Sequence, residues 1–200
     1  MTEIKHGEFV GPDVQDDVLL YVPEDAGQYE WIDGHIREVS EPQVEHGFVC
    51  TKVTVALGTY VDEHKLGMVL SADTLFLLQE EPRNVRGPDV VFVDKSKPMP
   101  RVHGVWFIAP DLVVEVQSPS QRGKFMLRKS SDYLKAGVRL VWVVDPQTRT
   151  VVRYRNGEEP VTLQEHDVLD GEDVIPGFRC PISGLFPPPR AGLPRVNGGS

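Results

Sequence analysis

Two segments of the chain are hydrophobic at consecutive rather than alternate positions. They cover residues 111–118 and 138–145 and consist mainly of valine and leucine. Such runs are typical of strands that lie inside a sheet and are covered on both faces. Residues 121–136 between them have helical spacing and would form the crossover connection. The pattern predicts an α/β fold in which a mixed central sheet is flanked by helices.

A longer helix is predicted from Pro42 to about Leu66. Apolar residues recur there at three- and four-residue steps, and Gly67 follows as a stop signal. The positions expected to face the core are Val49, Val53, Leu57, Tyr60, Val61 and His64. At the second helix, Ser118 or Ser120 can cap the first turn and Gly137 can end the last one.

Turn signals mark two hairpins and several short strands. An N-terminal hairpin is expected in YEWIDGHIREVS, with Asp33-Gly34 as its turn, and a C-terminal one in TVVRYRNGEEPVTL, with Asn156-Gly157 as its turn. Both dipeptides suit the positive φ angles of tight hairpin turns. Further strands are expected at 68–71, 73–78 and 87–94.

The length and the placement of turn signals indicate one domain. A chain of 200 residues can form one well-developed core. We expect a polar, proline-punctuated lead-in at 1–27, a single domain at 28–186 and a disordered Pro/Gly-rich tail at 187–200.

The composition narrows the class of protein. A net charge of −9 argues against a protein that coats nucleic acid through a broad basic surface. The N-terminal segment lacks the apolar stretch of a secretory signal, and no apolar run approaches the ~20 residues of a membrane span. Cys50 and Cys180 are expected to be reduced, buried thiols. We expect a cytoplasmic protein that makes no contact with a membrane.

One carboxylate lies within a predicted buried strand. Glu115 interrupts the run 111–118, and burying a charge costs several kcal/mol unless a cation or hydrogen bonds compensate it. Asp89 follows Pro88 at the start of the predicted strand 87–94. Two carboxylates on neighbouring strands can share a divalent ion, and oxygen ligands favour Mg²⁺ or Mn²⁺. In the structural alternative, Asp89 caps a turn and Glu115 pairs with an arginine.

The second helix carries a lysine in its apolar stripe. Phe125, Lys129 and Tyr133 follow one another at four-residue steps, so this face should pack on the sheet. The stripe is flanked by Met126 and Leu134. An inward Lys129 needs an anionic neighbour, which Glu115 can supply, either as a purely structural ion pair or within a catalytic set.

Two carboxylates and a lysine form a recognisable chemical set. The carboxylates can hold a metal ion that activates water and stabilises charge on a phosphoryl group. The lysine can orient the water or neutralise the developing charge. Gln117, two residues after Glu115 on the same strand face, can add a polar contact.

These residues resemble the signature of the PD-(D/E)XK nucleases, with Gln117 at the usual lysine position. More specifically, the chain resembles the Uma-two family of restriction endonucleases. The matching pieces occur in family order over about residues 29–146, with weaker similarity to about 186. They are YEWIDGHIREVS, EPQVEHGFV, GPDVVFV, PDLVVEVQSPS, KSSDYLKAGV and RLVWVVDP.

The resemblance implies a restriction-endonuclease-like fold and specific roles. It implies that Asp89 and Glu115 are metal ligands and that the catalytic lysine has moved to the helix as Lys129, four residues before Tyr133. It also implies that Glu30 and His46 are accessory residues. The chain departs from the family at Gln121, where threonine is common, and at Phe125, where aspartate is common.

Three functions fit this set of residues. The first is a Mg²⁺- or Mn²⁺-dependent DNA endonuclease, expected to be a homodimer so that two centres can address two strands. The second is a catalytically silent module that binds DNA or protein. The third is a phosphoesterase acting on a small molecule. The acidic composition favours the last two, whereas the intact set of Asp89, Glu115 and Lys129 favours the nuclease.

Overall fold

The computed structural model describes residues 29–32, 35–38, 44–71, 74–80, 84–98, 105–118 and 123–188. The lead-in predicted at 1–27 and residues 189–200 of the predicted tail lie outside the described residues. The described part contains a six-stranded sheet, a four-stranded sheet and a separate strand pair. None of the described helices has the length and apolarity that crossing a membrane requires.

The six-stranded sheet is the mixed central sheet that the hydrophobic pattern predicted. In spatial order its strands are β10 (Val161–Leu163), β9 (Thr150–Tyr154), β8 (Leu140–Asp145), β7 (Leu112–Val116), β6 (Val90–Asp94) and β3 (Gly67–Ser71). β7 is parallel to β8 and antiparallel to β6. The three strands predicted at 87–94, 111–118 and 138–145 are therefore neighbours, as expected.

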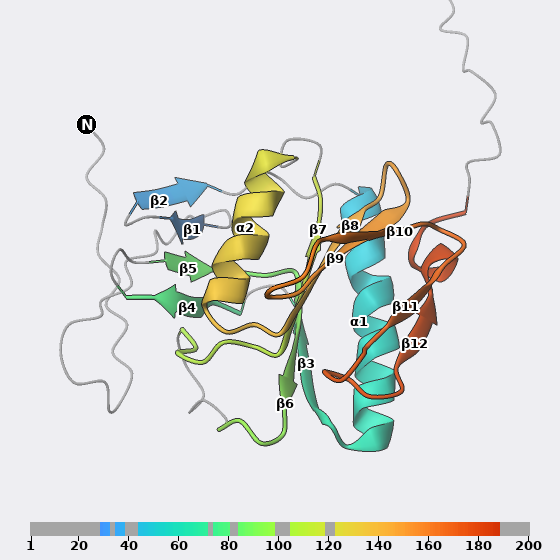
Figure 1. Ribbon diagram of the computed structural model, residues 1–200, viewed down its shortest axis with the longest axis horizontal. Helices are drawn as coiled ribbons and strands as arrows, with labels where there is room; N and C mark the ends of the chain where they lie inside the picture. The colour runs from blue at the N-terminus through green and yellow to red at the C-terminus, as the bar shows by residue number, and fades with distance from the viewer. Residues whose placement is uncertain are drawn as a thin grey trace, which may run out of the picture.

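Two helices cover opposite faces of this sheet (Figure 1). α1 (Val44–His64) packs against one face through Val49, Val53, Leu57 and Val61. α2 (Lys124–Lys135) packs against the other through Met126 and Tyr133, with Phe125 and Leu134 partly buried beside them. The core-facing residues of α1 and α2 thus match the predicted helical faces, including Tyr60, which is half-buried and packs against the core. His64 is the exception, because it is exposed and stacks on Tyr60.

A four-stranded sheet lies on the α2 side of the molecule (Figure 1). Its order is β2 (His35–Glu38), β1 (Tyr29–Ile32), β5 (Asn84–Arg86) and β4 (Phe76–Gln79). The pairing of β1 with β2 confirms the N-terminal hairpin. β4 overlaps the strand predicted at 73–78 and ends one residue later. β5 was not predicted, because a strand of three residues is too short to show an alternating pattern. Phe76 of β4 stacks on Trp106 at 5.6 Å between ring centroids and joins the core under α2.

The C-terminal part adds elements that the sequence did not indicate. β11 (Val168–Asp170) pairs with β12 (Arg179–Pro181), and the 3-10 helix η1 (Ile182–Leu185) packs against α1. Gly171 permits this compact arrangement, because a Cβ at this position would lie 2.4 Å from the carbonyl oxygen of Ile175. The segment closes the α1 side of the core with side chains such as Ile175 and Ile182.

The predicted hairpin of β9 and β10 is confirmed, with a turn at Asn156-Gly157 that the Glu158 N–H closes by donating to the carbonyl of Arg155 at 3.3 Å. Only Gly157 of this pair has positive φ, and the connection between the strands covers residues 155–160. Two predicted helix ends differ from the structure. α2 begins at Lys124 with Gly123 as its N-cap, later in the chain than the predicted cap at Ser118 or Ser120. Lys65, with φ of 53°, follows the end of α1, whereas Gly67 begins β3.

Candidate functional site

Glu115 forms a buried ionic centre with α2. Its side chain points from β7 toward that helix, and the residue is only 3% exposed. The Lys129 Nζ donates to Oε2 at 2.9 Å, and the Tyr133 hydroxyl donates to Oε1 at 2.5 Å. Lys129 therefore faces inward, as the helical stripe predicted, and Glu115 pairs with this lysine.

The local sequence explains how these groups meet. Glu115 shares a strand face with Val113, whose side chain belongs to the core beneath α2. Lys129 and Tyr133 are four residues apart, so both lie on the same side of α2. Because Lys129 is also 3% exposed, two opposite charges are removed from water together and compensate one another.

Asp89 lies at the start of β6 and connects β7 with α1. One carboxylate oxygen accepts a hydrogen bond from the backbone N–H of Val116 at 2.7 Å. The other lies 3.3 Å from Nε2 of His46. The Asp89 carboxylate is thus hydrogen-bonded to the backbone of Val116, the residue that follows Glu115 in β7.

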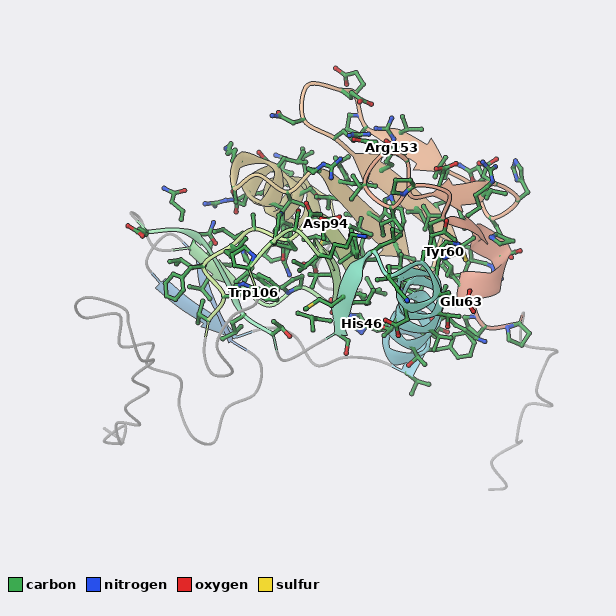
Figure 2. All side chains as sticks on the ribbon, turned by 90° about the horizontal axis from the view of Figure 1, so that it is seen from below. His46, Tyr60, Glu63, Asp94, Trp106 and Arg153 are labelled. Atoms are coloured by element: carbon green, nitrogen blue, oxygen red, sulfur yellow. The ribbon has the colours of Figure 1, made fainter. Side chains whose placement is uncertain are left out.

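His46 lies in the first turns of α1, on the side that faces the sheet (Figure 2). Burial lowers the pKa of its imidazole, but the hydrogen bond to Asp89 and the charges of Asp89 and Glu115 outweigh burial, so the pKa is raised. The positive charge of Lys129 opposes this rise. His46 is therefore electrostatically coupled to all three residues of the predicted catalytic set.

Cys50 is the member of this region that the sequence analysis missed. Its Sγ lies 3.5 Å from Nδ1 of His46. Burial, followed by the charges of Asp89 and Glu115, raises the pKa of the thiol. The four-residue spacing of His46 and Cys50 on a predicted helix was the available signal, because such residues are neighbours on one helical face.

The remaining predicted site residues lie at the margins of this centre. Gln117 follows β7, is half-buried, and its backbone N–H donates to the carbonyl of Val144 at 2.8 Å. Glu30 lies in β1 opposite Arg37, and its side chain is outside the described part of the structure. Phe125 is half-buried and packs against the core under α2.

The donor set of Asp89 and Glu115 fits a divalent ion. Both residues offer carboxylate oxygens, the ligand type that Mg²⁺ and Mn²⁺ prefer. Each carboxylate oxygen has more than one acceptor site, so the bonds from Lys129 and Tyr133 do not exhaust the capacity of Glu115. By their chemistry, both carboxylates could serve as ligands of such an ion.

We expect Tyr133→Phe to destabilise the fold by about 1.5–3 kcal/mol, because it removes a hydrogen bond to a buried carboxylate. Tyr60→Phe is the matched control, since the Tyr60 hydroxyl donates to the neutral carbonyl oxygen of Pro176 at 2.8 Å in a more exposed place. The control should cost about 1 kcal/mol or less. Urea unfolding of the two variants measures the difference in the free energy of unfolding. Equal losses would show that the hydrogen bond of Tyr133 stabilises the fold no more than that of Tyr60.

Comparisons with known proteins identify the fold and the family. A solved structure with the same fold is described as a putative nuclease belonging to DUF820 from Anabaena variabilis ATCC 29413, with a TM-score of 0.71 and 21% sequence identity. The match covers 79% of this chain and 89% of that chain. No curated protein matches the sequence. The model of the Uma2 family, described as "Putative restriction endonuclease", matches residues 16–183, so the chain belongs to that family.

Proposed function

We propose that this protein is a divalent-metal-dependent endonuclease that hydrolyses phosphodiester bonds of DNA. Membership of the Uma2 family and the nuclease-like fold support nuclease activity in general. The metal requirement, the choice of DNA and the roles of individual residues are the further content of the proposal.

The observation that carries the proposal is the arrangement around Glu115. A lysine from α2 lies 2.9 Å from this carboxylate, and Asp89 is bonded to the next backbone N–H of the same strand. We infer that these two acids and the lysine, from three segments of the chain, act together near the end of β7. This is the set that phosphodiester hydrolysis needs.

Each residue has a role that follows from its position. Asp89 and Glu115 would hold Mg²⁺ or Mn²⁺, which supplies an activated water and a Lewis acid for the phosphoryl group. Lys129 orients the attacking water or neutralises charge that develops on the phosphate. Tyr133 fixes the rotamer of Glu115 through its short hydrogen bond. Gln117 and Glu30 are proposed as accessory polar contacts.

A basic surface beside α2 supports DNA as the substrate. Lys124, Arg128 and Lys135 line a hollow between α2 and the four-stranded sheet, although the protein carries a net charge of −9. Local positive charge of this kind can contact a phosphate backbone. We further propose a homodimer, in which two centres address the two strands, and a cytoplasmic location.

A catalytically silent binding module is the second candidate. The observation in its favour is that Lys129 and Tyr133 already bond both oxygens of Glu115, so the set is electrostatically satisfied without an ion. Phe125, at the position where aspartate is common in the family, also favours the catalytically silent module.

Plasmid nicking by the purified protein separates the two candidates. The nuclease is expected to convert supercoiled DNA to nicked or linear DNA with Mg²⁺ or Mn²⁺ and to stop when EDTA is added. A protein that binds DNA but leaves it intact with both ions would support the silent module. The salt dependence of binding reports whether phosphate contacts are used.

A further inference from the structure

His46, Cys50 and Asp89 bring three different types of metal-binding group together. Each can offer one ligand atom, and these atoms all lie within 4.8 Å of one another. The three side chains are half-buried. Imidazole, thiolate and carboxylate are ligands of Zn²⁺ and similar borderline-soft ions, whereas Mg²⁺ takes hard oxygen ligands. The cluster therefore has different ion chemistry from the pair of Asp89 and Glu115.

α1 already holds two of the donors at a chelating distance. His46 and Cys50 are four residues apart on the helix, and Sγ lies 3.5 Å from Nδ1. In a tetrahedral site with bonds of about 2.0–2.3 Å, neighbouring ligand atoms are about 3.3–3.8 Å apart. The pair falls within this range, so binding needs no change in the backbone of the helix.

The third donor comes from the start of β6. The Asp89 carboxylate lies 3.3 Å from Nε2 of His46, which is the ring nitrogen opposite the one that contacts Cys50. One ion uses a single ring nitrogen of His46, so binding all three groups requires the imidazole to turn until this nitrogen faces the thiolate and the carboxylate together. One ligand atom from each residue already lies within 4.8 Å of the other two, about 1 Å more than the separation in a tetrahedral site. Water can complete the tetrahedron.

The charges around the cluster favour a cation. The carboxylates of Asp89 and Glu115 both act on the Cys50 thiol and on the His46 imidazole. The N-terminal end of α1 opposes a cation with the equivalent of about half a positive charge. Lys129 also offsets the charge of Glu115, so the negative charge that favours the ion comes mainly from Asp89 and from the thiolate that forms on binding. The incoming ion replaces the thiol proton, which passes to solvent.

We propose that His46, Cys50 and Asp89 form a binding site for a borderline-soft divalent ion such as Zn²⁺. Asp89 belongs to this site and to the proposed Mg²⁺ site, so an ion held through Cys50 withdraws a ligand from Mg²⁺. Zn²⁺ therefore inhibits DNA cleavage. This consequence rests on the proposed nuclease function, whereas the existence of the Zn²⁺ site does not.

Titration of the full-length protein with Co²⁺ tests the site directly. Co²⁺ takes the coordination of Zn²⁺, and a thiolate bound to it gives a charge-transfer absorption band in the near ultraviolet. We expect this band in the wild-type protein and expect Zn²⁺, but not Mg²⁺, to remove it. Cys180→Ser is the matched control, because Cys180 is the other cysteine of the chain and is also half-buried. It should retain the band.

Variants of the cluster give the opposite result. Cys50→Ser and Cys50→Ala are both expected to lose the band, so the outcome does not depend on the folding of a single variant. His46→Gln should keep a thiolate and bind Co²⁺ at least roughly tenfold more weakly. Absence of a thiolate band in the wild type, or its persistence in both Cys50 variants, overturns the proposal.

Inhibition is measured separately, as the Zn²⁺ concentration that halves the Mg²⁺-dependent nicking rate. In Cys50→Ser this concentration should rise at least roughly tenfold relative to the wild type. Equal values contradict the inhibitory role even if the cobalt band is present. If the protein cleaves no DNA, the proposed function fails, while the cobalt spectrum still decides on the site.

Discussion

Glu115→Gln is expected to abolish metal-dependent DNA cleavage and the stabilisation of the fold by Mn²⁺. Glutamine keeps the shape of the side chain but carries no charge to balance a divalent ion. We expect the nicking rate to fall at least roughly 100-fold. An ion that binds only the folded state stabilises it by about 2.7 kcal/mol at one hundred times its dissociation constant. Nicking assays and thermal melts with and without Mn²⁺ measure both losses.

The matched control is Glu158→Gln. Glu158 is an exposed glutamate that pairs with Arg153 at 2.7 Å, away from Glu115. Exposed ion pairs contribute little, so the variant should unfold within about 1 kcal/mol of the wild type and retain the Mn²⁺ effect. A wild-type protein whose melting temperature ignores Mn²⁺, or a Glu115→Gln variant that still nicks DNA, would contradict the assigned metal ligand.

The centre of the molecule could be predicted because local patterns determine it. A carboxylate within a run of valines must have a partner, and a lysine within an apolar helical stripe must have one too. Since the helix connects two neighbouring parallel strands, Glu115 and Lys129 are natural partners for each other. The same reasoning identified both helices and the central strands, because long periodic segments carry the strongest signals.

Contacts between segments far apart in the sequence could not be predicted from local patterns. The approach of Asp89 to His46 joins β6 with α1, and no periodicity in either segment indicates it. Cys50 lies beside His46 on the same helix, so its four-residue spacing from His46 could have indicated it. The pairing of β11 with β12 and the position of β5 depend on three-residue strands, which are too short to show alternation. The start predicted for α2 at residue 121 was too early, because SPSQ is typical of a helix start whereas α2 begins at Lys124.

Lys129→Met is expected to lower the free energy of unfolding of the metal-free protein by about 3–5 kcal/mol, because it leaves Glu115 buried without its counter-charge. Glu115→Gln should lower the free energy of unfolding by a similar amount, because it leaves Lys129 buried without its counter-charge. The double variant removes both charges, so its loss should be smaller than the sum of the single losses by about 2 kcal/mol or more. Urea unfolding of the four proteins in EDTA measures this coupling.

Lys135→Met supplies the control, since Lys135 is exposed at the end of the same helix and its loss should cost less than about 1 kcal/mol. Additive losses in the double variant would show that the pair at 2.9 Å contributes no coupling energy. Mn²⁺ then separates a structural pair from a metal centre. In Lys129→Met an ion bound by Asp89 and Glu115 replaces the missing positive charge, so it should recover part of the lost stability. In Glu115→Gln it should recover none, because the stranded charge is itself positive.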